Sequence, residues 1–129
     1  MIPTVIDTNN FLRFLLNDIP EQKKEFEKLI KKAIKSKKSL IVPQIVIFEI
    51  NFTLEKYYHY PKEEIIEKLQ SIISAPYFVV QDSSVFQMSI RLFSENNLSL
   101  ADCFIFAYSK DNQADLFTFD ENLKKLSKK

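Results

Sequence analysis

The chain has 129 residues and a formal net charge of +1 at pH 7, with 46% hydrophobic and 27% charged residues. These values are typical of one folded domain and argue against a disordered chain or a two-domain enzyme. A chain of this length usually contains about 9 glycines, whereas this one has none, which excludes the glycine-rich phosphate loops of nucleotide-binding proteins. One cysteine and one histidine cannot form a structural zinc site or a disulfide framework.

Strand-like and helix-like segments alternate along the chain. Strands are predicted from β-branched or apolar runs at residues 2–7, 40–42, 77–80 and 116–119. Apolar residues at helical spacing predict one helix before and one helix after a break at residues 17–20. Further helices are predicted over residues 44–58, 85–96 and 99–110, from Pro61 onward, and in a short segment that starts at Asp120. Residues 44–58 carry apolar side chains on most sides, which predicts a largely buried helix.

Long helical segments between strands require crossover connections, which place the strands parallel with helices on both faces of the sheet. We therefore predict an α/β fold, a three-layer α/β/α sandwich with a small parallel sheet of four to five strands. The prediction treats residues 1–129 as a single domain. Ligands of such sheets bind beyond the carboxyl ends of the strands, so acidic residues at those ends are candidate site residues.

Neither a membrane segment nor a secretory signal is expected. No uncharged run approaches the roughly 20 residues that a membrane-spanning helix needs. The first residues have no basic region, apolar core or cleavage site, so we expect a cytoplasmic protein. The charge is uneven, because residues 21–38 hold eight Lys and three Glu, and residues 121–129 hold four Lys and one Glu.

Four acidic residues lie at the ends of predicted elements or among apolar residues: Asp7, Glu49, Asp102 and Asp120. Asp7 and Asp120 can be explained as helix N-caps, and Asp102 has the capping-box spacing from Ser99. Glu49 is harder to explain, because it has no basic residue three or four positions away and an unpaired buried carboxylate is costly.

If these four carboxylates point into one cleft, cations are needed to offset their repulsion. An all-oxygen ligand set favours Mg²⁺ or Mn²⁺ over zinc. Such ions stabilise the attacking and leaving oxygens of phosphodiester displacement and lower the pKa of a bound water. The sequence therefore predicts metal-dependent phosphodiester hydrolysis.

The four acids occur in motifs with a characteristic order and spacing. These motifs are Val5-Ile6-Asp7-Thr8-Asn9, Phe48-Glu49-Ile50, Leu100-Ala101-Asp102-Cys103-Phe104-Ile105 and Thr118-Phe119-Asp120. They resemble the ordered acidic motifs of PIN-domain nucleases, with the closest likeness to VapC-type toxins of toxin–antitoxin pairs. The resemblance covers nearly the whole chain.

The resemblance implies an endoribonuclease whose catalytic metal ligands are Asp7, Asp102 and Asp120, with Glu49 binding Mg²⁺ or Mn²⁺ directly or through water. It further implies that Asn9 and Thr118 orient these ligands by hydrogen bonds. The implied partners are an RNA substrate, a second copy of the chain in a homodimer, and a small antitoxin whose tail fills the acidic groove.

The chain departs from the family pattern at two places. Cys103 and Phe104 follow the third acid, where small residues are usual, so helix packing near the metal is expected to differ. Only residues 121–129 follow the fourth acid, so the sheet is expected to have four strands or a shortened fifth. Neither change removes a predicted ligand.

Several other features have two interpretations. The eight lysines of residues 21–38 can contact an RNA backbone or form a solvated helix face. Arg13 can contact phosphate or pair with an acid. The aromatic cluster at residues 57–60 can stack on bases, or serve in packing or a dimer contact. Cys103 is expected to be a small buried hydrophobic residue.

Two other functions fit a small α/β sandwich. A phospho-accepting receiver domain needs a second acid after the first strand, and this chain has Thr8 and Asn9 there. A PIN-fold module that binds RNA or protein without cutting is the main alternative. The presence of all four acids argues against that alternative, because loss of one ligand is enough to inactivate such a site.

Overall fold

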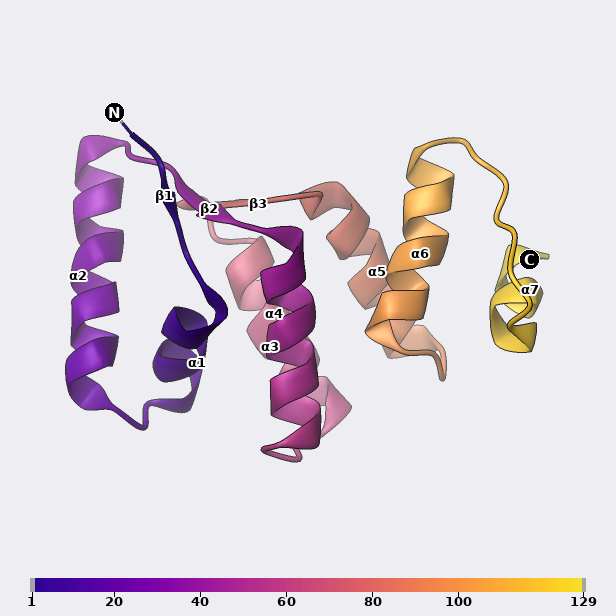
Figure 1. Ribbon diagram of the computed structural model, residues 1–129, viewed down its shortest axis with the longest axis horizontal. Helices are drawn as coiled ribbons and strands as arrows, with labels where there is room; N and C mark the ends of the chain where they lie inside the picture. Colours follow the sequence, from indigo (N-terminus) through magenta and orange to yellow (C-terminus); the bar gives the residue numbers. More distant parts are fainter. Residues whose placement is uncertain (1, 129) are drawn as a thin grey trace. The chain divides into compact units, whose positions relative to one another are not determined.

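The computed structural model describes residues 2–128, which form two compact units that meet at Gln81 and Asp82 in the sequence. The first unit contains a sheet and four helices (Figure 1). Its strands are β1 (Thr4–Val5), β2 (Leu40–Val42) and β3 (Phe78–Val80). Its helices are α1 (Thr8–Leu16), α2 (Pro20–Ser36), α3 (Gln44–Lys56) and α4 (Lys62–Ile73).

The three strands are parallel and lie in the order β1-β2-β3. In the register of the sheet, Leu40 of β2 is opposite Thr4 on one side and Phe78 on the other. The ladder continues past β1, because the backbone N–H of Ile6 donates to the carbonyl of Ile41 at 2.9 Å. Asp7 therefore comes directly after Ile6, the last residue of this segment that is hydrogen-bonded to β2, at the carboxyl end of the sheet.

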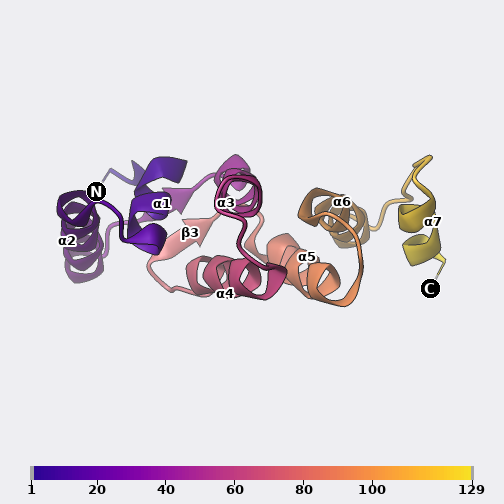
Figure 2. The ribbon, with the colours of Figure 1, turned by 90° about the horizontal axis from the view of Figure 1, so that it is seen from below.

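Helices cover both faces of this sheet. Figure 2 shows β3 between a layer that contains α1 and α3 and a second layer that contains α4. The rings of Phe11 and Phe26 meet edge to face with centroids 5.4 Å apart, and Phe78 contacts Phe11 at 5.1 Å. Edge-to-face contacts of this kind add to the stability that burial of apolar area provides.

The helices of the first unit begin and end without glycine. Asp7 caps α1, and Pro20 occupies the first turn of α2, where its missing N–H costs no hydrogen bond. At the ends of these helices, Asn17 (φ 55°) and Lys37 (φ 59°) adopt the left-handed conformation that glycine usually provides. The Lys37 N–H donates to the carbonyls of Ala33 and Ile34, so the turn satisfies the last carbonyls of α2.

The second unit consists of α5 (Ser83–Glu95), α6 (Leu100–Asp111) and α7 (Glu121–Ser127). The rings of Phe86 in α5 and Phe104 in α6 lie 4.8 Å apart. Leu123 and Leu126 of α7 form a buried cluster with Phe106 of α6. Apolar packing thus joins the three helices within this unit.

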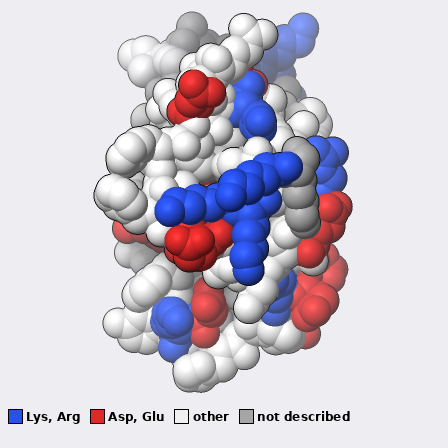
Figure 3. All heavy atoms as spheres, turned by 90° about the vertical axis from the view of Figure 1, so that its right-hand side faces the viewer, with Lys and Arg blue, Asp and Glu red and all other residues white. Residues whose placement is uncertain are grey.

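The space-filling view in Figure 3 shows acidic and basic side chains interspersed on the surface that faces the viewer. Lys124 pairs with Glu121 of the same helix at 3.4 Å. Glu121 therefore partly offsets the positive charge of α7.

The α/β class, the parallel sheet and the order of the helices agree with the prediction from sequence, but the number of strands does not. The described residues contain three strands instead of four or five, and the predicted strand at residues 116–119 has no strand neighbour. A strand needs a hydrogen-bonded partner as well as suitable side chains. Phe117 and Phe119 are 85% and 82% exposed, which shows that alternating apolar residues did not pack as a sheet would require.

No helix among the described residues is long and apolar enough to cross a membrane.

The α3 helix offers a matched test of the core. Ile47 is fully buried, whereas Ile45, on the same helix, is 61% exposed. We expect Ile47→Ala to lower the free energy of unfolding by about 2–5 kcal/mol, because it removes buried methyl groups and leaves a cavity. We expect Ile45→Ala to cost less than about 1 kcal/mol. Urea denaturation followed by circular dichroism measures both, and equal losses would contradict the burial pattern.

Candidate functional site

A pocket of about 720 Å³ lies in the first unit at the carboxyl end of β1. The end of β1, the first residues of α1 and one face of α3 form its walls. Its polar residues are Asp7, Thr8, Asn9, Glu49 and Thr53. Apolar side chains, among them Ile45, Phe48 and Phe52, complete the lining. The pocket thus places two carboxylates beside an apolar wall.

Glu49 is held in this pocket by a side chain from α1. The Thr8 hydroxyl donates a hydrogen bond to Oε1 of Glu49 at 2.6 Å, which joins residues 41 positions apart in the sequence. A hydrogen bond to an ionised carboxylate is stronger than one between neutral groups. Thr8 therefore fixes the position of one carboxylate and links the two helices that follow β1 and β2.

The prediction that residues 44–58 form a largely buried helix was only partly right. One face of α3 is buried, through Val46, Ile47, Ile50 and Leu54, while Glu49 is exposed to solvent. The apolar residues Ile45 and Phe52 are also more than half exposed. The helical period brings these three residues together on the pocket side, so Glu49 needs no buried cation to offset its charge.

Asp7 caps α1, as its ordinary structural interpretation requires. Its Oδ1 accepts a hydrogen bond from the backbone N–H of Asn10 at 3.1 Å. This bond occupies one carboxylate oxygen and leaves Oδ2 for a ligand. Asp7 is exposed and lines the pocket, so a capping role and a ligand role are compatible.

The charges of the pocket fit a cation. Among residues 2–128, its lining contains two carboxylates and no Lys, Arg or His. Hydroxyl and amide oxygens from Thr8 and Asn9 complete a set of hard oxygen donors, which is the chemistry that Mg²⁺ and Mn²⁺ prefer. Within the described part of the chain, no group of three or more His, Cys, Asp or Glu residues is arranged to hold a metal. The first unit thus brings two carboxylates to one pocket.

Asp102 and Asp120 belong to the second unit, where each lies at the start of a helix. The backbone N–H of Asp102, in the first turn of α6, donates to Oγ of Ser99 at 3.1 Å, which is one half of the predicted capping box. Asp120 caps α7, because its Oδ1 accepts from the N–H of Leu123 at 2.9 Å. As with Asp7, capping occupies only one oxygen of the Asp120 carboxylate.

The other predicted site residues have distinct surroundings. Asn9 lines the pocket beside Asp7. Oγ1 of Thr118 accepts a hydrogen bond from the backbone N–H of Asp120 at 3.0 Å. Thr118 therefore contacts the backbone of Asp120 through this bond. Arg13 pairs with Asp18 at 2.7 Å, which matches the second of its two interpretations. Cys103 is buried, as expected.

Sequence reasoning did not assign a role to Thr8. Thr8 belongs to the Asp-Thr-Asn motif, but a contact between residues 41 positions apart leaves no local sequence pattern. The signal available was the motif itself, since a hydroxyl next to a strand-end acid lies at the same edge of the sheet as that acid.

Comparison with known proteins decides the family. The sequence profile of the PIN domain matches residues 4–129. The chain belongs to the PIN domain family. A VapC ribonuclease from Aquifex aeolicus (strain VF5) is 27% identical to it over 99 residues, which cover 77% of this chain and 73% of that protein. The PIN profile spans both compact units, from β1 to the last described helix.

Substitutions at Asp7 can separate its capping role from its charge. Asn caps helices about as well as Asp, so we expect Asp7→Asn to leave the free energy of unfolding nearly unchanged or slightly raised. Asp7→Ala removes the cap and should cost about 1 kcal/mol. Thermal or urea unfolding of both variants measures the difference. If Asp7→Asn is as destabilising as Asp7→Ala, the hydrogen bond from the Asn10 N–H to the side chain of residue 7 does not contribute to stability as the geometry indicates.

The hydrogen bond from Thr8 to Glu49 gives a second prediction in this PIN-domain pocket. Thr8→Val keeps the shape of the side chain but removes the donor, and we expect it to weaken Mn²⁺ binding about tenfold or more, as loss of a ligand-orienting partner commonly does. Thr8→Ser keeps the hydroxyl and is the matched control. Calorimetric titration with Mn²⁺ measures both. Equal affinity of the Val and Ser variants would show that Thr8 does not orient Glu49.

Proposed function

We propose that the protein is a metal-dependent endoribonuclease that hydrolyses RNA phosphodiester bonds, and that it is the toxin of a toxin–antitoxin pair. The observation that carries the proposal is the pocket at the end of β1, where Asp7 and Glu49 lie and to which the described part of the chain contributes no basic residue. Membership of the PIN domain family and the likeness to a protein named VapC ribonuclease support it.

The proposed catalytic metal ligands are Asp7, Glu49, Asp102 and Asp120. Asp7 and Glu49 are supported by their shared pocket, and all four by their order in the family motifs. Mg²⁺ or Mn²⁺ is the proposed cofactor, because every donor is a hard oxygen. Asn9 and Thr118 are proposed to help position these acids.

Within this proposal, the polar side chains Thr8, Asp7, Asn9 and Glu49 of the pocket have specific roles. Thr8 holds Oε1 of Glu49, and the N-cap bond to Asn10 fixes the orientation of the Asp7 carboxylate. The divalent ion would supply electrostatic stabilisation of the attacking and leaving oxygens and a more acidic water. Asn9 can donate its amide N–H to a phosphate oxygen of the substrate. Hydrolysis is proposed to leave 5′-phosphate and 3′-hydroxyl ends.

The proposal includes the organisation and partners of the protein. Residues 1–129 are treated as one PIN-like nuclease domain, which the match of a single profile over both units supports. A homodimer, a small antitoxin that blocks the acidic groove, and a cytoplasmic location follow from the VapC-type function. The acidic and partly apolar pocket suits an antitoxin tail with both basic and apolar side chains.

We expect cleavage of single-stranded RNA by the wild type in Mg²⁺ or Mn²⁺ and its loss on addition of EDTA. Asp7→Asn, Glu49→Gln, Asp102→Asn and Asp120→Asn should each lower the rate by about 100-fold or more, because each removes a negative charge that holds the divalent ion, and the ion stabilises the charge that develops in the transition state. Asp18→Asn is the control, since Asp18 pairs with Arg13 and does not line the pocket. The rates are measured on a labelled RNA under single-turnover conditions.

Equal cleavage by the wild type and all four variants would refute the proposed active site. If the wild type takes up Mn²⁺ in calorimetry but cuts no RNA, a different substrate is indicated. If it takes up no Mn²⁺ and still binds RNA, the protein is the non-cutting PIN-fold module described above.

A further inference from the structure

A second hollow adjoins the candidate active site. It has a volume of about 590 Å³ and shares two lining residues, Asp7 and Asn9, with the first pocket. The remainder of its wall comes from Asn10 and from one face of α2. The α2 residues are Gln22, Glu25, Phe26, Lys28, Leu29 and Lys32. We call this hollow the α2 groove; it and the first pocket meet at Asp7 and Asn9.

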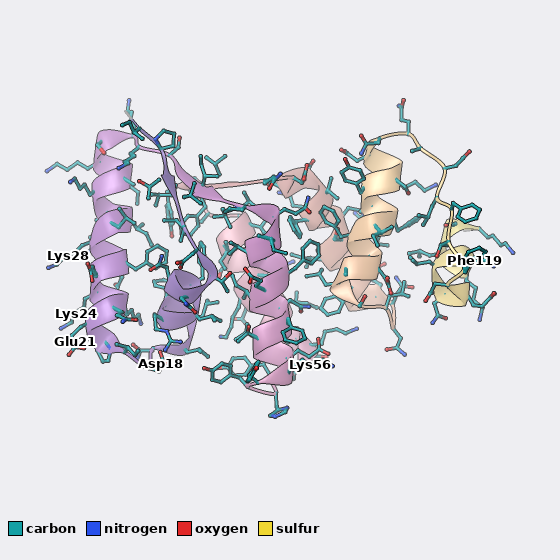
Figure 4. The ribbon with its side chains drawn as sticks, viewed as in Figure 1. Asp18, Glu21, Lys24, Lys28, Lys56 and Phe119 are labelled. Carbon is teal, nitrogen blue, oxygen red and sulfur yellow. The ribbon has the colours of Figure 1, made fainter. Side chains whose placement is uncertain are left out.

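The α2 groove divides the lysines of α2 into two sets. Lys28 and Lys32 line the groove and are exposed. Lys24 and Lys31 are exposed on the same helix but do not line it. Figure 4 labels Lys24 and Lys28 along α2. The sequence pattern treated these lysines as equivalent, whereas the structure brings two of them to a hollow that reaches the site.

The chemistry of the groove suits a nucleic-acid backbone. Lys28 and Lys32 are one helical turn apart, so their ammonium groups lie on one side of α2. Asn9, Asn10 and Gln22 provide amide groups of the kind that commonly hydrogen-bond phosphate and sugar oxygens. Two carboxylates lie in the same wall and oppose binding of an anion: Glu25 of α2 and Asp7, where the groove meets the first pocket.

We infer that the α2 groove holds the backbone of the RNA strand next to the bond that is cut, with Lys28 and Lys32 on its phosphates. The inference rests on the proposed ribonuclease function, since it assigns the path of the bound RNA strand beyond the first pocket. The strand passes Asp7 and Asn9, where the two hollows meet, and continues along α2. Lys28 and Lys32 position the substrate and take no part in the chemical step.

The test compares two double variants with the same loss of charge on the same helix. Lys28→Gln/Lys32→Gln removes the groove lysines, and Lys24→Gln/Lys31→Gln is the matched control. Affinity for a fluorescein-labelled single-stranded RNA is measured by anisotropy over a range of KCl concentrations, with EDTA present to prevent cleavage. Circular dichroism checks that both variants remain folded.

We expect the groove variant to bind RNA on the order of tenfold more weakly than the control at 0.1 M salt. The slope of log affinity against log salt should become shallower by about 1.4 for the groove variant, because each phosphate contact on a single strand contributes about 0.7. In Mn²⁺, the groove variant should raise KM for RNA cleavage with little change in kcat.

A third variant tests the same groove by a change that should tighten RNA binding instead of weakening it. Glu25→Gln removes the carboxylate that α2 contributes to the groove wall, so we expect it to tighten RNA binding by several-fold at low salt. Glu27→Gln is its control, because Glu27 is on α2 but does not line the groove. The same anisotropy titration measures both variants.

Equal weakening of RNA binding by the two lysine variants, with the wild type active, would overturn the assignment of the α2 groove and leave the proposed ribonuclease intact. If the wild type neither binds nor cuts RNA, the proposed function itself fails. If the groove variant keeps its RNA affinity but loses affinity for polyglutamate, the groove serves an acidic protein partner, which also overturns the inference.

Discussion

The hydrogen bond between Thr8 and Glu49 is the contact on which the candidate site depends. It joins the start of α1 to the middle of α3, and therefore joins the two segments that leave the carboxyl ends of β1 and β2. Without it, a flexible glutamate on an exposed helix face would be free to turn toward solvent. With it, the carboxylate is fixed in the same pocket as Asp7, and two negative charges lie in one pocket, as the proposed cation site requires.

The acids of this PIN-domain protein also contribute to its secondary structure. Asp7 caps α1 and Asp120 caps α7, each through a single carboxylate oxygen. Capping fixes the rotamer of the side chain and so reduces the entropy that would be lost when a ligand binds to the second oxygen. A structural role and a functional role at the same residue are therefore mutually supportive, and neither can be used to exclude the other.

Local signals in the sequence predicted most of the fold. Pro61 and Ser99 mark helix starts within one residue of their observed positions, because caps and proline act over a single turn. The strand predicted at residues 116–119 failed for the opposite reason, since strand formation depends on a partner elsewhere in the chain. The same limit applies to the site: spacing identified the acids, but the Thr8 contact and the choice of Lys28 and Lys32 depend on tertiary structure.

The lack of glycine affects the unfolded chain as well as the native one. Among the described residues, the left-handed conformation is adopted by Asn17, Lys37, His59, Asp82 and Gln113. Each carries a Cβ atom, which makes this conformation less favourable by roughly 1 kcal/mol than it is for glycine. The same Cβ atoms restrict the denatured ensemble and so reduce the entropy that folding must overcome, by about 0.4–1 kcal/mol per position. The entropic gain offsets only part of the conformational cost, so each of these five positions keeps a net cost in stability that glycine would not have.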